Sequence, residues 1–209
     1  MAEPKLVVVS APSGAGKTTL VHELLKRRPD LNFSVSYTTR PQREAEIHGK
    51  DYFFVDAQEF ERMRGCGEFL ESARVFDHCY GTSRAHVNDL LASGHSVLME
   101  IDWQGARQVR GAAPEAVGIF ILPPSRAELE RRLRGRGTDS KGVISRRLAE
   151  AVADMRHWRE FDYVVINEEI DVATGQIAEI LRGAGQRFRT DSPEIGAAVL
   201  AIIEGRGAG

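Results

Sequence analysis

Short apolar runs alternate with amphipathic segments along most of this 209-residue chain. The runs are unbroken and rich in β-branched residues, which is typical of strands buried on both faces of a parallel sheet. They lie at residues 6–9, 96–101, 117–122 and 162–166. The pattern therefore predicts a sheet of buried strands in the core of the protein.

Segments with helical periodicity separate these runs, at residues 18–28, 83–92, 125–134, 142–160 and 171–182. The helix expected at 125–134 has a clear start, because Ser125 is followed three residues later by Glu128 in a capping-box arrangement. Strands that alternate with helices predict an α/β fold with a central parallel sheet flanked by helices.

Two stretches interrupt this alternation within an expected single domain. Residues 34–82 carry short β-like pieces, a charged loop and a helical pattern near 57–64, which indicates an insertion. Residues 131–148 are rich in arginine and glycine. This composition predicts a mobile element that is exposed to solvent. The expected parts are a core at about 4–33, 83–125 and 161–187, an insertion at about 34–82, a mobile lid at about 126–160, and a tail at 188–209.

Composition narrows the function classes. A net charge of −2 argues against nucleic-acid binding, for which a basic footprint is expected. No apolar run reaches the length of a membrane span, and the opening residues lack a signal-peptide layout. Cys66 and Cys79 have no metal-ligand spacing, so we expect reduced thiols in a cytoplasmic protein. Only five of the 28 basic residues are lysines, an arginine excess that fits either bidentate phosphate binding or a codon bias.

The first apolar run leads into a loop of small residues that reads A-P-S-G-A-G-K-T. It matches the phosphate-loop pattern G-x-x-x-x-G-K-[ST] except at its first glycine, and in such loops backbone N–H groups and a helix N-terminus cradle phosphate. Lys17 would reach the β- and γ-phosphates, Thr18 would complete a magnesium site, and Gly14 and Gly16 would take positive φ or approach the phosphates closely. The residues expected to hold a nucleoside triphosphate are Ala11, Pro12, Ser13, Gly14, Ala15, Gly16, Lys17 and Thr18.

A phosphate loop alone does not separate kinases from GTPases. The stretch D-W-Q-G at 102–105 would satisfy the D-x-x-G of a GTPase switch. A GTPase also needs an N-K-x-D element to read guanine, and none of the asparagines in this chain stands in one. The GTPase interpretation therefore fails.

Seven motifs together resemble the guanylate kinase family, in family order and spacing over roughly residues 5–187. They are APSGAGKTT, TTRPQREAEIHGKDY, GEFLES, YGTS, EIDWQG, PPS and RLRGRGT. The resemblance implies a P-loop kinase fold with a GMP-binding insertion and a mobile lid. It also implies ATP and GMP as substrates.

The family's GMP-binding positions fall on ten residues of this chain. They are Ser36, Arg40, Arg43, Glu46, Tyr52, Glu71, Tyr80, Thr82, Glu100 and Asp102. The two arginines and two tyrosines suit the nearly dianionic phosphate of GMP. The resemblance implies that Ser36, Glu71 and Thr82 contact the guanine. One carboxylate such as Glu71 can accept from both the N1–H and N2–H₂ donors of guanine, a pattern that adenine reverses.

The chain departs from the family pattern at three of its positions. Glu100 stands where aspartate is usual, so its contact stays open, and Glu100 and Asp102 occupy the place of carboxylates that order magnesium. Thr82 replaces a common serine and keeps the hydroxyl. Tyr37 replaces a small hydroxyl residue, and we assign it no role.

The resemblance implies the reaction ATP + GMP → ADP + GDP, dependent on Mg²⁺, with dGMP as a second acceptor. The acceptor oxygen of GMP is already anionic, so no general base is required, and catalysis consists of alignment and charge neutralisation. The catalytic residues implied are Lys17, Asp102, Arg132, Arg136 and Arg147, with Asn167 near the adenine.

Two alternatives stay open at this point. One is a kinase of the same fold that acts on a ribose bisphosphate, although the guanine-binding set would then have no use. The other is a non-catalytic interaction module, which would be expected to have a degraded phosphate loop and lid. The sequence leaves protein partners and the oligomeric state open, a homo-oligomer included.

Overall fold

The computed structural model describes residues 4–75, 77–135 and 141–206. Within these residues, five strands form one sheet in the order β2-β7-β1-β8-β9, and four form another in the order β4-β3-β6-β5. The strands of the first sheet are β1 (Leu6–Ser10), β2 (Leu31–Phe33), β7 (Ser96–Glu100), β8 (Val117–Leu122) and β9 (Tyr163–Ile166). β2 pairs in parallel with β7, and β8 in parallel with β9, which confirms the predicted α/β fold with a parallel sheet.

Residue contacts divide the chain into two compact units. The first unit comprises Met1–Val8 and Pro29–Ala116, and the second comprises Val9–Arg28 and Val117–Gly209.

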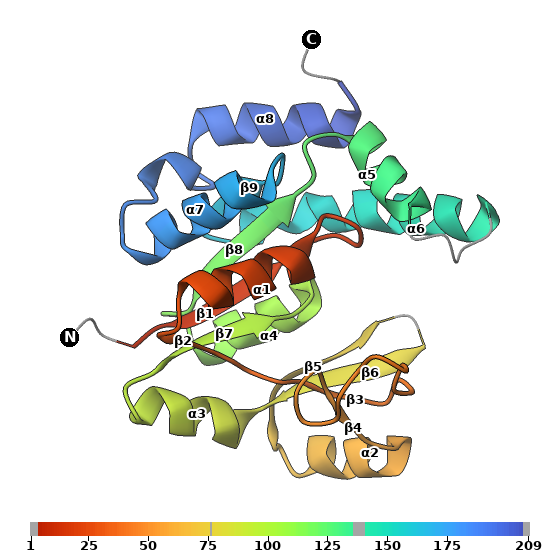
Figure 1. Ribbon diagram of the computed structural model, residues 1–209, viewed down its shortest axis with the longest axis vertical. Coiled ribbons are helices and arrows are strands. Elements are labelled where there is room, and N and C mark those ends of the chain that lie inside the picture. Colours follow the sequence, from red (N-terminus) through yellow and green to blue (C-terminus); the bar gives the residue numbers. More distant parts are fainter. Residues whose placement is uncertain (1–3, 76, 136–140, 207–209) are drawn as a thin grey trace. The chain divides into compact units, whose positions relative to one another are not determined.

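The second unit contains β8, β9 and most of the long helices (Figure 1). Its helices are α1 (Lys17–Arg27), α5 (Arg126–Arg134), α6 (Lys141–Met155), α7 (Ile170–Leu181) and α8 (Pro193–Glu204), with short 3₁₀ helices η1 (Arg156–Glu160) and η2 (Gln186–Phe188). α1 contacts α7, and α5 contacts α6. Leu20 and Leu24, one turn apart on α1, and Ile177 on α7 are fully buried, so apolar helix faces form the core of this unit.

The first unit contains β2, β7 and the four-stranded sheet (Figure 1). Its remaining elements are β3 (Tyr37–Thr38), β4 (Phe53–Phe54), α2 (Ala57–Gly65), β5 (Phe69–Val75), β6 (His78–Ser83), α3 (Arg84–Ala92) and α4 (Trp103–Ala112). β6 runs antiparallel to both β3 and β5, and this register places Glu71 of β5 opposite Thr82 of β6. α4 packs against β5, which brings a helix next to the strand that carries Glu71.

Several of the predicted helix starts are confirmed. Ser125 caps α5, because its hydroxyl oxygen accepts from the backbone N–H of Glu128 at 3.1 Å. Ser192 caps α8 in the same way, with Pro193 in the first turn. The predicted strands and helices of the core otherwise agree with the observed bounds to within a residue or two, apart from the end of the helix expected at 142–160.

Two strands and one α-helix of the described residues were not predicted, and one predicted helix ends early. β2 is only Leu31–Phe33 with a polar residue at its centre, too short to stand out as an apolar run. β6 was not recognised because its sequence, HCYGTS, has little apolar content. α4 contains two glycines, which obscure its helical pattern. The helix expected at 142–160 stops at Met155 and continues as η1, with Trp158 buried there.

We expect Gly81→Ala to destabilise the protein. The added Cβ would lie 3.0 Å from Cγ and Cδ1 of Phe69, a ring that already contacts Phe60 and Tyr37 and so has little room to move. The free energy of unfolding should fall by about 1–3 kcal/mol, measured as a lower urea midpoint at an unchanged m-value. Gly65→Ala is the control, because its Cβ would meet nothing within 4 Å. Equal stabilities of the two variants would contradict this packing argument.

Candidate functional site

The phosphate loop leaves the carboxyl end of β1 and ends in the first turn of α1. β1 is buried along its whole length, so the loop is anchored to the core. Gly14 and Gly16 have φ angles of 89° and 92°, which confirms that both take the left-handed conformation that favours glycine. All eight predicted loop residues, 11–18, lie in this turn and at the start of α1, where Lys17 is the first helical residue and Thr18 is exposed.

Side chains from outside the loop occupy the space next to its two glycines. A Cβ on Gly14 would lie 2.9 Å from Cδ2 of Leu133 and 3.0 Å from Cδ1 of Leu129, both on α5. A Cβ on Gly16 would lie 2.5 Å from Nδ2 of Asn167, the residue after β9. The two glycines are therefore required both for their backbone conformation and for this close packing.

The carbonyl oxygen of Ala15 accepts two hydrogen bonds from side chains. Asn167 donates from Nδ2 at 2.8 Å, and Arg132 donates from Nη1 at 3.2 Å. Arg132 also donates from Nη2 to the backbone oxygen of Asn167 at 3.0 Å. Asn167 is only 2% exposed. The structure thus brings together Arg132, predicted for the lid, and Asn167, predicted for the adenine side, on one carbonyl of the phosphate loop.

Arg147 on α6 reaches the same loop by a separate contact. Its Nη2 donates to Oγ of Ser13 at 3.3 Å. Two of the three predicted lid arginines, Arg132 and Arg147, therefore contact the phosphate loop. The third, Arg136, lies outside the residues that the structure describes.

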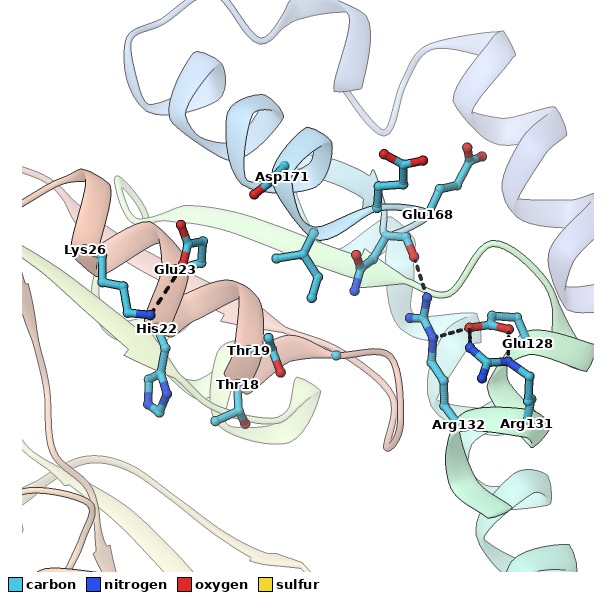
Figure 2. Close-up of a pocket in the computed structure, with 14 residues that line it drawn as sticks. Thr18, Thr19, His22, Glu23, Lys26, Glu128, Arg131, Arg132, Glu168 and Asp171 are labelled. Atoms are coloured by element: carbon cyan, nitrogen blue, oxygen red, sulfur yellow. Dashed lines mark hydrogen bonds and ion pairs between the residues drawn. The ribbon is translucent and has the colours of Figure 1, made fainter. Parts of the chain in front are cut away.

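An open pocket of about 970 Å³ lies beside the phosphate loop. Its walls come from α1, from α5 and from residues 167–171. Figure 2 shows Thr18 and Thr19 on the α1 side and Glu128 and Arg132 on the α5 side. The volume is in the range of small-molecule sites, and the charged walls suit a polar ligand.

Two arginines surround the carboxylate of Glu128 at the rim of this pocket. Glu128 accepts from Nε of Arg131 at 2.6 Å and from Nε of Arg132 at 2.7 Å (Figure 2). These hydrogen bonds, first from Arg131 and then from Arg132, lower the pKa of Glu128 to about 2. The carboxylate is therefore ionised at neutral pH, and it fixes the direction in which Arg132 points.

A buried carboxylate marks the predicted guanine site in the first unit. Glu71 is 3% exposed, and its Oε1 accepts from Oγ1 of Thr82 at 2.7 Å. Oγ of Ser36 lies within hydrogen-bonding distance of Thr82 Oγ1, at 3.3 Å, and both of these hydroxyl residues are buried. The structure thus places side by side all three residues that the sequence assigned to the guanine.

Glu46 contacts both arginines of the predicted phosphate site. Its Oε1 accepts from Nη2 of Arg40 at 2.6 Å, and its Oε2 accepts from the backbone N–H of Arg43 at 2.9 Å. The hydrogen bond from Arg40 is the main cause that lowers the pKa of Glu46. Arg40 is mostly buried in this pair, whereas Arg43 is exposed.

The two tyrosines of the predicted phosphate site pack beside Arg40. The rings of Tyr52 and Tyr80 meet edge to face with centroids 5.9 Å apart, and Cζ of Arg40 lies 5.4 Å from the centre of the Tyr52 ring. Burial, and then the nearby carboxylate of Glu100, raises the pKa of Tyr52 to about 12. Tyr52 therefore stays protonated at neutral pH and keeps an O–H donor for an anion.

The carboxylates of Glu100 and Asp102, at the end of β7 and the start of α4, have different local settings. Glu100 is the last residue of β7. Asp102 is the N-cap of α4, where its Oδ1 accepts from the backbone N–H of Gly105 at 2.8 Å and its Oδ2 accepts from Nε2 of Gln104 at 3.2 Å. The capping hydrogen bond holds the Asp102 carboxylate in a defined orientation. This cap was not predicted from the sequence.

The donor set near the phosphate loop suits Mg²⁺ as an ion shared with nucleotide phosphates. Across residues 4–75, 77–135 and 141–206, no group of three or more His, Cys, Asp or Glu side chains could hold a metal ion. Mg²⁺ prefers oxygen ligands and usually takes most of them from water and substrate phosphates. The exposed hydroxyl of Thr18, which lines the pocket, is an oxygen donor of the right kind.

Three residues at these sites were not predicted to take part in them. The capping-box spacing located Glu128 as a helix residue but did not indicate its pair with Arg132. Gly105 and Gln108 of α4 lie against β5, beside the predicted guanine site. No local pattern indicates these two, because the contacts join segments far apart in the sequence.

Comparison with known proteins gives consistent matches. A family model described as guanylate kinase matches residues 3–184. The guanylate kinase of Methylococcus capsulatus is 48% identical over 203 residues, which cover 97% of this chain and 100% of that protein. The guanylate kinase of Dechloromonas aromatica is 55% identical over 183 residues, 88% of this chain and 91% of the relative. The crystal structure of guanylate kinase from Anaplasma phagocytophilum has a TM-score of 0.74 at 35% identity, covering 93% of this chain and 94% of that chain.

We expect Glu128→Gln to lower stability at neutral pH but not in strong acid. The pKa of Glu128 falls from 4.5 to about 2 on folding, so its charge stabilises the protein above pH 4.5, and this contribution is lost as the pH falls toward 2. The Tm of the variant should lie below that of the wild type at pH 7, and the difference should narrow between pH 4.5 and 2. Glu130→Gln, which breaks only an exposed pair with Arg134, is the control and should change Tm less. A Tm difference that stays constant with pH would contradict the ionic contribution.

Proposed function

The chain belongs to the guanylate kinase family, and we propose that the sites described above carry out that family's reaction, the transfer of the γ-phosphoryl group of ATP to GMP. The chain is an enzyme with guanylate kinase activity, and GDP and ADP are its products. The observation that carries the assignment of residues is the buried Glu71 carboxylate with its two hydroxyl neighbours.

We assign the ATP site to the phosphate loop and the pocket beside it. The positive-φ glycines turn the loop backbone around a small space, and the N-terminus of α1 adds a dipole that favours phosphate. Lys17, at the start of α1, is the residue that we assign to the β- and γ-phosphates. The polar pocket next to Asn167 supports a nucleoside beyond those phosphates.

We assign the guanine of GMP to Glu71, Thr82 and Ser36. A buried carboxylate is costly unless its oxygens are satisfied, and Thr82 satisfies Oε1 with one hydrogen bond. Guanine presents two neighbouring N–H donors that a single carboxylate can accept, which supports Glu71 as the group that selects the base. Adenine would place an acceptor where guanine has N1–H, so the carboxylate would lose a hydrogen bond, a loss of the order of 1–3 kcal/mol.

We assign the phosphate of GMP to Arg40, Arg43, Tyr52 and Tyr80. Arg40 is held by Glu46 and by the Tyr52 ring, so its guanidinium is already oriented before an anion arrives. Glu46 binds the backbone N–H of Arg43, and the side chain of Arg43 is exposed, which supports its reaching a phosphate oxygen. Two guanidinium groups and two phenols match a dianionic monoester.

The mechanism that follows uses alignment and charge neutralisation. A phosphate oxygen of GMP attacks the γ-phosphorus of ATP, the bond to the β–γ bridging oxygen breaks, and ADP leaves; no general base is needed because the attacking oxygen is anionic. Lys17, Arg132, Arg147 and Arg136 would neutralise the transferring group. Mg²⁺, held by Thr18 and ordered from the side of Asp102, would supply further charge neutralisation on the phosphates.

Arg132 requires a rearrangement to reach the γ-phosphate. Its guanidinium is bound to the Ala15 and Asn167 carbonyls and to Glu128, which supports a positioning role for it beside the phosphate loop. Closure of a lid at about residues 126–160 would exchange these contacts for phosphate oxygens and exclude water from the reaction.

The two alternatives from the sequence are not favoured. A kinase for a ribose bisphosphate would have no use for a buried carboxylate flanked by two buried hydroxyls. An interaction module would not need the glycine geometry of the phosphate loop or the lysine and threonine that follow it.

The arrangement in parts and the cellular location belong to the same proposal. We infer a single guanylate-kinase-like domain with the insertion at about 34–82, in line with a family match that runs through it. In the described part of the chain, none of the helices has both the length and the apolarity to cross a bilayer. We propose that the enzyme works in the cytoplasm on free nucleotides.

The first test is a coupled assay of ADP release with GMP, dGMP, AMP, UMP and a ribose bisphosphate as acceptors. We expect turnover with GMP, and with dGMP as a second acceptor, and little with the others.

Lys17→Ala should lower kcat with GMP by about a hundredfold or more, because a cation at the transferring phosphoryl group is lost. Circular dichroism and GMP binding by calorimetry should be unchanged in this variant. A normal kcat in Lys17→Ala would remove the loop assignment.

The second test addresses the guanine site. Glu71→Gln replaces one acceptor oxygen by an N–H₂ donor, which faces the donors of guanine. We expect the ratio of kcat/KM for GMP to that for AMP to fall about tenfold or more, since 1.4 kcal/mol corresponds to a factor of ten. Glu61→Gln, on an exposed pair with Arg64, is the matched control and should leave the ratio unchanged. An unchanged ratio in Glu71→Gln would show that another group selects the base.

A further inference from the structure

The carboxylate of Glu71 lies against the first turn of α4. Gly105 is the third residue of that helix and is buried. A Cβ built on Gly105 would lie 2.5 Å from Oε2 of Glu71 and 3.1 Å from its Cδ. Only a hydrogen atom fits between the helix backbone and this carboxylate, because real Cβ atoms do not approach an oxygen so closely.

The strand that carries Glu71 is attached to the same helix. Nε2 of Gln108, one turn after Gly105, donates to the backbone oxygen of Ser72 at 2.7 Å, and its Oε1 accepts from the Ser72 N–H at 3.0 Å. Gln108 thus binds β5 as a neighbouring strand would. Because these two hydrogen bonds hold the backbone next to Glu71, β5 cannot retreat from α4 to make room for a larger residue.

On its other side the carboxylate is held by β6. Thr82 stands opposite Glu71 in the strand pairing and donates to its Oε1 at 2.7 Å. Gln108 holds the backbone of β5 and Thr82 binds Oε1, and in this arrangement Oε2 lies over Gly105. A side chain at residue 105 would therefore rotate the carboxylate away from Thr82.

Backbone conformation does not explain a glycine at residue 105. Its φ lies outside the left-handed region, and it sits within a regular helix, where alanine is more favourable than glycine. Gly111, in the same helix, has nothing within 4 Å of a built Cβ. The space taken by the Glu71 carboxylate is the feature that distinguishes Gly105 from Gly111.

We propose that Gly105 is a positioning residue that sets the selectivity of the enzyme for guanine, by leaving room for the Glu71 carboxylate in the orientation that accepts from the base. The inference rests on the proposed role of Glu71 in binding GMP. It assigns to α4 a second task besides carrying the capped Asp102.

Gly105→Ala tests this inference, with Gly111→Ala as the matched control in the same helix. In Gly105→Ala we expect the KM for GMP to rise by about tenfold or more, since small displacements of a binding group have effects of this size. The KM for ATP should stay unchanged, and the GMP-to-AMP ratio of kcat/KM should fall. Gly111→Ala should leave all three quantities unchanged. A normal KM for GMP in Gly105→Ala would overturn the proposal.

A double-mutant cycle separates this effect from general damage to the helix. In a Glu71→Ala background no carboxylate faces residue 105, so adding Gly105→Ala should leave GMP affinity at the level of Glu71→Ala alone. A further loss of affinity of the same size in that background would overturn the proposal, because Gly105 would then act through another group, such as Asp102.

The affinities are best measured by calorimetry with GMP alone, since this readout does not depend on phosphoryl transfer. If the wild-type protein binds GMP but transfers no phosphoryl group, the proposed function fails while the cycle still decides the role of Gly105. If the wild type is an active guanylate kinase and Gly105→Ala binds GMP normally, the inference alone fails.

Discussion

The proposed phosphate-binding loop of this protein depends on the geometry of the turn from β1 into α1. A loop that presents backbone N–H groups to phosphate has to reverse direction within a few residues, and Gly14 and Gly16 make this possible by taking positive φ. The absence of side chains at these positions also allows close packing, of Leu129 and Leu133 on Gly14 and of Asn167 on Gly16. Gly14 and Gly16 thus both shape the loop and leave room for the side chains that pack against it.

One backbone carbonyl, that of Ala15, then connects the loop to its surroundings. Asn167 and Arg132 both donate to it, and Glu128 orients the arginine from the other side. The arrangement couples α5 to the phosphate loop through a single charged group. If the loop binds phosphate as proposed, a nucleotide has to compete with these contacts for the Arg132 guanidinium.

The proposed guanine site in the first unit is also built on close packing at a glycine, but around a carboxylate rather than an arginine. A carboxylate that is 3% exposed is stable only where hydrogen bonds replace water, and Thr82 provides one of them. Its second oxygen lies over Gly105, at the capped start of α4, where the helix dipole favours a negative group. Both sites therefore depend on close packing at a glycine. At the phosphate loop, neighbouring side chains pack against the loop glycines, and at α4 the carboxylate of Glu71 packs against Gly105.

Much of the fold was predictable because its signals are local. The β-branched runs, the capping serine Ser125 and the phosphate-loop glycines all act within a few residues of their position. The short strands β2 and β6 and the helix α4 were missed because neighbours distant in the sequence stabilise them, and their own composition is neutral.

Some features of the candidate sites could likewise be predicted from the sequence, and others could not. The sequence by itself indicated the phosphate loop, with a lysine and a threonine after a glycine turn, and its resemblance to the guanylate kinase family implied a glutamate, a serine and a threonine for guanine. Only the tertiary structure decided that Arg132 binds the Ala15 carbonyl and that Gly105 leaves space for Glu71. The physical reason is that both contacts join segments far apart in the chain, whose meeting depends on packing and strand register rather than on any local preference.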